Sequence, residues 1–142
     1  MRIDLSLELE RYAAKAAMRA VIGDVTNAPK IEAVFAEHKP EVVFHAAAYK
    51  HVPLMEEHPE EAARVNVLGT HIVAEAACRH GAERLVFIST DKAVHPVNVL
   101  GASKRIGEMI VSAISAHSKT LGTSVRFGNV LGSRGSVVPT FE

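Results

Sequence analysis

The sequence predicts an α/β protein built on a parallel sheet with helices on both of its faces, a doubly wound arrangement. Short runs rich in β-branched and aromatic residues alternate along the chain with longer stretches that have the apolar spacing of helices. The short runs show little inside–outside alternation, which is typical of strands buried on both faces of a parallel sheet. No repeat and no linker rich in Pro, Gly or Ser divides the sequence, so residues 1–142 are expected to form one domain.

Four strands and four helices are expected from this pattern. The predicted strands span 20–22, 42–44, 85–88 and 124–127. The predicted helices span 5–18, 29–37, 60–80 and 99–120. Two ends carry specific signals, because Ser6 suits the N-cap of the first helix and Gly81 suits the C-cap of the third.

Composition excludes several classes of function. Sixteen basic and sixteen acidic residues balance, which leaves no electrostatic footprint for nucleic acid or an acidic membrane. Trp is absent and aromatic residues make up 5% of the chain, so platforms for base stacking are not expected. No uncharged run approaches the ~18 residues that a membrane-spanning helix needs. The single Cys78 cannot form an internal disulfide, which fits a cytoplasmic protein.

The carboxyl ends of the predicted strands are the first candidates for a site, because ligands of such sheets bind there. Small or polar residues follow each strand, at 23–24, 45–48, 89–92 and 127–129. Asp91 and Lys92 leave one buried strand, and Lys104 opens the next helix. Two ammonium groups in one cleft would lower each other's pKa and suit a lysine to act as a base. Alternatively, Asp91 and Lys92 form a solvated loop pair and Lys104 lies on an exposed helix face.

The eight histidines do not predict a metal site. His45, His51 and His58 have no cysteine partners, and their spacing does not place them on one helix face. We therefore expect no metal.

Five segments match one family pattern in order and register: Val42-Val-Phe-His-Ala-Ala-Ala-Tyr-Lys-His-Val-Pro53, Asn66-Val-Leu-Gly-Thr70, Ser89-Thr-Asp-Lys92, Asn98-Val-Leu-Gly-Ala-Ser-Lys104 and Arg126-Phe-Gly-Asn-Val-Leu-Gly-Ser-Arg-Gly-Ser-Val-Val-Pro139. On these segments the chain resembles the extended short-chain dehydrogenase/reductase family, and within it the CapD-like polysaccharide biosynthesis branch of nucleotide-sugar 4,6-dehydratases. The match runs from about Gly23 to the last residue.

The resemblance implies a Rossmann-like sheet, of which this chain carries a part. Aligned on the motifs, the chain lacks the first two strands and the C-terminal substrate region. The resemblance also implies NAD, rather than NADP, as the cofactor, and a UDP-N-acetylhexosamine such as UDP-N-acetylglucosamine as the substrate. The implied reaction is a redox-neutral 4,6-dehydration in surface polysaccharide synthesis: a hydride leaves C4, water leaves across C5–C6, and the hydride returns to C6.

The family's site residues carry over position by position. Asp91 corresponds to the general acid for the departing C6 hydroxyl, and Lys92 to the base at C5. Thr90 would bond the sugar, and Lys104 would hold the nicotinamide ribose. The residues expected along the dinucleotide are Asp24, Val25, Ala46, Ala47, Ala48, Asn66 and Ser89, with Asn66 equally open to a structural role. Those expected at the nucleotide-sugar are Lys50, His51, Asn129, Arg134 and Ser136.

Two departures from the family pattern stand out. Leu100 occupies the position of the usual catalytic tyrosine, and a lost general base typically costs about 10²–10⁴-fold in rate. Membrane-attached members of the branch also carry an apolar residue there, so Leu100 marks that subgroup and leaves inner-membrane attachment of the parent open. The glycine-rich turn that seats the NAD pyrophosphate is missing, and the glycines at 128–135 mimic its spacing without a following helix. We therefore expect the isolated chain to lack useful NAD affinity.

Three hypotheses follow. The parent protein is a 4,6-dehydratase, or a related nucleotide-sugar epimerase or reductase, or the chain is an inactive piece that acts only as an interaction module. The Asp91-Lys92 pair favours the first, because simple epimerisation at C4 needs no acid and base at C5–C6. Helices 60–80 and 99–120 correspond to the family's dimer faces, and the edge of strand 42–46 would lack its neighbour. We therefore expect a homo-oligomer.

Overall fold

The computed structural model describes residues 19–128 of the chain. Its sheet has three parallel strands, β1 (Val42–His45), β2 (Arg84–Thr90) and β3 (Leu121–Phe127), side by side in the order β1-β2-β3. The register places Val43 of β1 beside Leu85 of β2. The predicted parallel α/β sheet and three of its four strands are confirmed.

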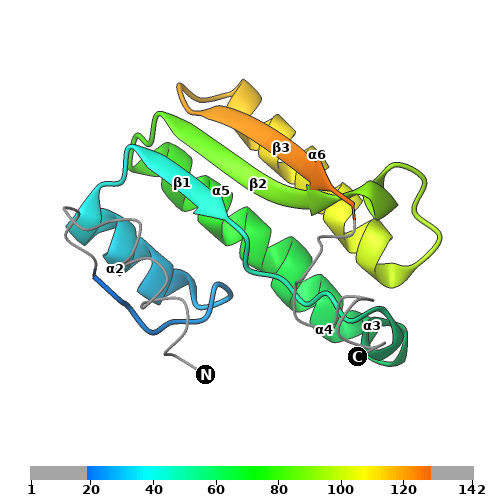
Figure 1. Cartoon of the computed structure of the whole chain (residues 1–142). Coiled ribbons are helices and arrows are strands. Elements are labelled where there is room, and N and C mark those ends of the chain that lie inside the picture. Colours follow the sequence, from blue (N-terminus) through cyan, green and yellow to red (C-terminus); the bar gives the residue numbers. More distant parts are fainter. Residues whose placement is uncertain (1–18, 129–142) are drawn as a thin grey trace, which may run out of the picture.

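One helix precedes β1, and the others occupy the connections between the strands (Figure 1). They are α2 (Ala28–His38), α3 (Val52–Glu57), α4 (Pro59–Ala62), α5 (Gly69–Arg79) and α6 (Val99–Ala116). A π-helical turn, Ala63–Leu68, joins α4 to α5, so the predicted helix over 60–80 is divided into three parts. A short 3₁₀ turn, Asp91–Ala93, follows β2.

The core lies between the sheet and one layer of helices. Alternate residues of β2 point inward, and Leu85 and Phe87 are buried against α5 and α6. Alanines on α5 let that helix approach the sheet closely. Phe35 of α2, which packs on α5, belongs to the same buried cluster. In Figure 1 the helices of this layer lie behind the sheet. Among residues 19–128 no helix covers the other sheet face, where Phe44 is 70% exposed.

Three details of the predicted elements need correction or lie outside the description. The strand predicted at 20–22 is wrong, because no strand lies beside it in residues 19–128 to complete its hydrogen bonds. The helix predicted at 99–120 ends at Ala116, since the chain must turn before β3 begins at Leu121. The helix predicted at 5–18 lies outside the described residues. No helix of the described part is both long and apolar enough to span a bilayer.

Candidate active site

The carboxyl ends of β1 and β2 lie at the same edge of the sheet, as the parallel topology requires (Figure 1). β1 ends at His45 and leads into the loop 46–51, while β2 ends at Thr90 and leads into the turn Asp91–Ala93. The N-terminus of α6 packs against this turn. Gly101 allows the contact, because a Cβ there would lie 2.4 Å from the carbonyl oxygen of Lys92. The edge therefore brings together the loop after β1, the turn after β2 and the start of α6.

Asp91 and Lys92 form an ion pair at the end of β2. Nζ of Lys92 lies 3.1 Å from Oδ1 of Asp91, and the Thr90 hydroxyl donates to the same oxygen at 3.0 Å. The hydrogen bonds from Lys92 and Thr90 lower the pKa of Asp91 below its usual value. Asp91 is exposed and Lys92 is half-buried. This arrangement matches the solvated loop pair, one of the two interpretations that the residues left open.

Lys104 is buried, contrary to the interpretation that places it on an exposed helix face. Its side chain is 6% exposed, and Nζ donates a 2.8 Å hydrogen bond to the carbonyl oxygen of Ile88 on β2. Nζ also lies 4.6 Å from the centre of the Phe87 ring, a cation–π contact. Burial lowers the pKa of Lys104 to about 8. The lowering comes from lost hydration and not from repulsion by Lys92, whose ammonium group is directed to Asp91.

Asn66 is fully buried in the π-helical turn, and its amide group is bonded within the protein. Oδ1 accepts from the Tyr49 backbone N–H at 2.8 Å, and Nδ2 donates to the Tyr49 carbonyl at 3.0 Å. Nδ2 also donates to the Ser103 hydroxyl at 3.0 Å. Asn66 thus fastens the loop after β1 to the residue that precedes Lys104. Of the two roles open to it from sequence, this geometry corresponds to the structural one.

Ser89, expected along the dinucleotide, instead faces α6. Its hydroxyl donates a 2.6 Å hydrogen bond to Oε1 of Glu108, which is 7% exposed. Arg126 of β3 grips the same carboxylate through Nε and Nη2, at 2.8 and 2.7 Å, and Arg105 approaches to 3.0 Å. These contacts, led by that of Arg126, lower the pKa of Glu108 to about 2. Glu108 was not predicted as a site residue, although an acidic residue one turn after Lys104 on an amphipathic helix was a usable signal.

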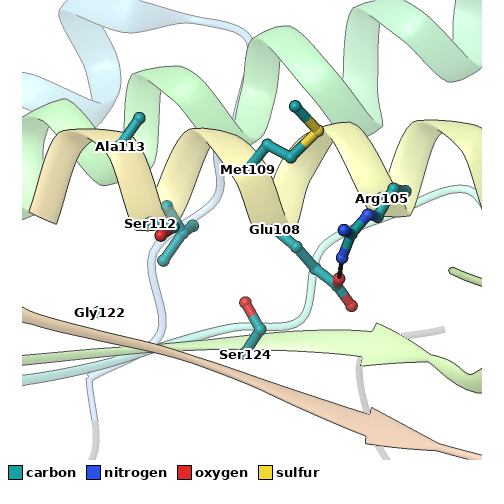
Figure 2. Close-up of a pocket in the computed structure, with 8 residues that line it drawn as sticks. Arg105, Glu108, Met109, Ser112, Ala113, Gly122 and Ser124 are labelled. Atoms are coloured by element: carbon teal, nitrogen blue, oxygen red, sulfur yellow. Dashed lines mark hydrogen bonds and ion pairs between the residues drawn. The ribbon is translucent and has the colours of Figure 1, made fainter. Parts of the chain in front are cut away.

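A cavity of about 510 Å³ lies beside this carboxylate, between α6 and β3 (Figure 2). Figure 2 shows Arg105 and Glu108 joined at one end of it, with Ser124 reaching from the strand. Its lining residues are Arg105, Glu108, Met109, Val111, Ser112, Ala113, Gly122 and Ser124. Asp91, Lys92 and Lys104 do not line this cavity, so it is separate from the carboxyl edge of the sheet.

The remaining dinucleotide candidates lie around β1. Ala46 and Ala47 are exposed and Ala48 is half-buried, which leaves an open strip of small residues along the loop. Asp24 accepts hydrogen bonds from the backbone and the hydroxyl of Thr26, both at 2.8 Å, which lower its pKa. Val25 packs on α5, where Gly69 makes room for it.

The nucleotide-sugar candidates are only partly described. Lys50 and His51 are exposed in the loop after β1. Asn129, Arg134 and Ser136 lie outside the described residues. The described part of the chain contains no group of three His, Cys, Asp or Glu side chains that could hold a metal.

Leu100 occupies the tyrosine position of the family pattern and is 6% exposed. It is buried in a small apolar cluster with Met55 of α3 and Ala62 of α4. Asn98 caps α6 by accepting from the Gly101 N–H at 2.7 Å, which sets the direction in which the first turn of α6 presents Leu100. The side chain therefore completes the packing of α3 and α4 onto α6.

The fold and this edge define a class of protein: a parallel α/β sheet with a polar site beyond the carboxyl ends of its strands. The family model described as polysaccharide biosynthesis protein matches residues 1–142, and the chain belongs to this family. It is 57% identical over 123 residues to the capsular polysaccharide biosynthesis protein CapD of Staphylococcus aureus, covering 86% of this chain and 20% of the relative. It is 54% identical over 121 residues to the probable polysaccharide biosynthesis protein EpsC of Bacillus subtilis, covering 85% and 20%. The CapD-like resemblance is thereby confirmed.

Other relatives and solved structures extend this relationship. A UDP-glucose 4-epimerase of Rickettsia canadensis is 43% identical over 127 residues, covering 87% of this chain and 37% of its own. The structure of Pen from Bacillus thuringiensis aligns with a TM-score of 0.83 at 37% identity, covering 96% of this chain and 42% of Pen. The Thermus thermophilus UDP-glucose 4-epimerase in complex with NAD aligns with a TM-score of 0.74 at 30% identity, covering 79% and 41%. By the coverages given above, the chain spans about a fifth of the length of the CapD and EpsC relatives.

Proposed function

We propose that this chain is the central part of an NAD-dependent UDP-N-acetylglucosamine 4,6-dehydratase of surface polysaccharide synthesis. The observation that carries the proposal is the combination of the Asp91–Lys92 pair at the end of β2 with the buried Lys104 anchored to the same strand. An elimination across C5–C6 needs one group to donate a proton and another to accept one, and this pair offers both.

The Asp91–Lys92 pair shares one proton, and the elimination needs one proton delivered at C6 and one removed at C5. In the described geometry Lys92 donates, and Asp91 accepts, the hydrogen bond that joins the pair. Transfer of that proton along the 3.1 Å hydrogen bond gives a carboxylic acid and a neutral amine without changing the total charge. The neutral Lys92 would then take the C5 proton, and Asp91 would protonate the C6 oxygen as its bond to carbon breaks. Water leaves, and the pair again holds one proton on Lys92.

The residues at this edge fit one end of NAD. Lys104 reaches the carboxyl edge from α6 and would hold the nicotinamide ribose, while the exposed Ala46 and Ala47 leave room for a flat ligand. Bound NAD would supply the acceptor and donor of hydride. Residues 19–128 include no glycine-rich turn between a strand and a helix that could seat the pyrophosphate. The fit therefore covers the nicotinamide side, and the chain alone is expected to bind NAD weakly.

The proton of the C4 hydroxyl needs an acceptor other than Leu100. The ammonium group of Lys104 has a pKa of about 8, so a fraction of it is neutral near pH 7–8. Asp91 and Lys92 are the alternative acceptors at the same edge. In this proposal Lys104, Asp91 or Lys92 takes the role that the catalytic tyrosine has in the family pattern.

Product analysis tests the proposal against the epimerase alternative, which the Rickettsia relative favours. The chain, extended on both sides to the length of its relatives, is incubated with NAD and UDP-N-acetylglucosamine in D₂O. A 4-keto-6-deoxy product that carries deuterium at C5 supports dehydration. A C4 epimer without deuterium at C5 overturns it in favour of epimerisation. The same incubation of the 142-residue chain, with calorimetric titration of NAD, tests whether the chain alone is inactive; micromolar affinity would contradict that expectation.

Self-association is part of the same proposal. Ile106 and Met109 of α6 and Leu68 of the π-helical turn are exposed apolar side chains on the helices expected to dimerise. Light scattering of the extended protein tests this. We expect a mass of at least two copies, lowered by Met109→Lys; a monomer at micromolar concentration would contradict it.

A further inference from the structure

We infer that His45 is a positioning residue: through Thr70 and Asn66 it holds the loop after β1 in the geometry that the proposed site requires. This inference deepens the proposed function and rests on it for its catalytic consequence. His45 is the last residue of β1, and the sequence suggested no role for it beyond its place at the strand end.

A buried hydrogen-bond chain begins at His45. Its ring is 4% exposed, and Nε2 lies 3.0 Å from the hydroxyl oxygen of Thr70 on α5. The Thr70 hydroxyl lies 2.7 Å from the carbonyl oxygen of Asn66, to which it donates. A hydroxyl has one proton, so Thr70 must accept from His45. His45 is therefore the tautomer that carries its proton on Nε2.

The Asn66 residue, whose backbone accepts from Thr70, extends the series of hydrogen bonds through its side chain. Asn66 bonds both the N–H and the carbonyl of Tyr49, and it donates to the Ser103 hydroxyl. The Ser103 hydroxyl in turn donates to the carbonyl oxygen of Leu100 at 3.0 Å. Four elements, β1, the π-helical turn, α5 and α6, thus meet in one polar network. Such networks specify a single arrangement when every member is bonded.

The surroundings keep His45 neutral, so only one of its two ring nitrogens carries a proton. Burial and the positive charge of Lys104 lower the pKa of His45 to about 4. The two side chains lie against the same Phe87 ring, whose centre is 5.6 Å from that of His45 and 4.6 Å from Nζ of Lys104. Lys104 of α6 is the charged group that acts on His45, while α5 contributes the neutral Thr70. A neutral His45 adds no second charge beside the buried ammonium group.

Loss of the His45 donor would remove the hydrogen bond that connects β1, through Thr70, to the backbone of the π-helical turn. The Asn66 amide would still be present, but its backbone would no longer be held from the sheet. The loop that carries Lys50 and His51 would then open more often. The loop would open more often while the hydrophobic core kept its packing, so measurements at the loop and at the core can be compared.

Four variants of the 142-residue chain separate positioning from general stability. His45→Gln keeps an N–H donor near the position of Nε2, and His45→Leu removes it. Thr70→Ser keeps the hydroxyl, and Thr70→Val removes it. Amide hydrogen exchange of Tyr49 reports the loop, and that of Phe87 reports the core. We expect Tyr49 to exchange at least tenfold faster in His45→Leu and Thr70→Val, with wild-type rates in the two conservative variants and at Phe87.

Nitrogen-15 NMR of wild-type His45 provides a second readout that does not depend on any variant folding. The expected spectrum is that of the Nε2–H tautomer, unchanged from pH 7 to pH 5. A neutral ring with its proton on Nδ1 overturns the inference. Unchanged Tyr49 exchange in both His45→Leu and Thr70→Val overturns it as well, and so does equal acceleration at Phe87.

Kinetics of the extended protein test the consequence for the site. His45→Leu is expected to raise KM for the UDP-sugar at least fivefold more than it lowers kcat, with His45→Gln restoring KM. An unchanged KM overturns the catalytic part of the inference. If wild-type protein forms no dehydrated product, the proposed function fails while the exchange and NMR results still decide the role of His45.

Discussion

Nζ of Lys104 and the carbonyl oxygen of Ile88 are joined by a 2.8 Å hydrogen bond that connects α6 to β2. The bond places a buried ammonium group at Ile88, two residues before Thr90 and three before the Asp91–Lys92 pair. The lysine therefore serves both the packing of α6 and the chemistry of the carboxyl edge. The pKa of Lys104 therefore reports how well its ammonium group is shielded from water.

The pH dependence of stability should reveal this burial. The folded pKa of Lys104, about 8, lies below its ordinary value of 10.5, so the unfolded chain binds more protons between these pH values. The free energy of unfolding of the wild type, relative to Lys104→Met, should rise by about 2–3 kcal/mol from pH 8 to pH 10.5 and stay flat below pH 8. Urea unfolding measures the difference. NMR titration of the Lys104 Cε signal provides the control, and a midpoint near 10.5 would contradict the prediction.

Glu108 should contribute stability that disappears in acid. Glu108→Gln removes a carboxylate held by Arg126, Arg105 and Ser89, and should cost about 2–3 kcal/mol at pH 7. The folded pKa of about 2 lies below the ordinary 4.5, so the wild-type advantage is complete above pH 4.5 and declines as the pH falls toward 2. Glu75→Gln, which breaks only surface pairs on α5, is the matched control, with a cost below about 1 kcal/mol. Equal costs for the two variants would refute the buried network.

Restoring the family tyrosine should not be neutral. Leu100→Tyr places a larger, polar side chain in the cluster of Met55 and Ala62, and overpacking of this kind costs about 1–3 kcal/mol. Leu100→Met keeps the volume and should cost less than about 1.5 kcal/mol. Thermal unfolding of the two variants measures the difference. A tyrosine variant as stable as the wild type would show that the cluster has room for the ring.

Asp91 and Lys92 should affect catalysis and not folding. Asp91→Asn and Lys92→Gln remove one member of an exposed ion pair, so each should change the free energy of unfolding by less than about 1 kcal/mol. In the extended protein each should lower kcat for dehydration by about 10²–10⁴-fold, because a proton donor or acceptor is lost. Lys30→Gln, a change at a half-buried position of α2, is the activity control. Wild-type turnover in both site variants would remove these residues from the mechanism.

Part of the fold and site could be predicted from sequence because the signals are local. The strands at 42–44, 85–88 and 124–127 are runs of β-branched and aromatic residues that suit a buried sheet, and each was placed to within three residues. The carboxyl edge followed from the parallel topology. The strand at 20–22 failed because a strand exists only beside a partner, and propensity contains no information about the partner.

The sequence by itself determined the parallel α/β class, the family and the place of Asp91, Lys92 and Lys104 at strand and helix ends. Only the tertiary structure decided which of these side chains is buried. Lys104 loses its water because Phe87 and Ile88 lie against it, whereas Asp91 stays exposed and Lys92 is only half-buried. It also decided that His45, Thr70 and Asn66 share one hydrogen-bond chain and that Glu108 meets Arg126. These contacts join residues 18 or more positions apart or lie in a helix of unexpected pitch, so their geometry depends on packing and not on local spacing.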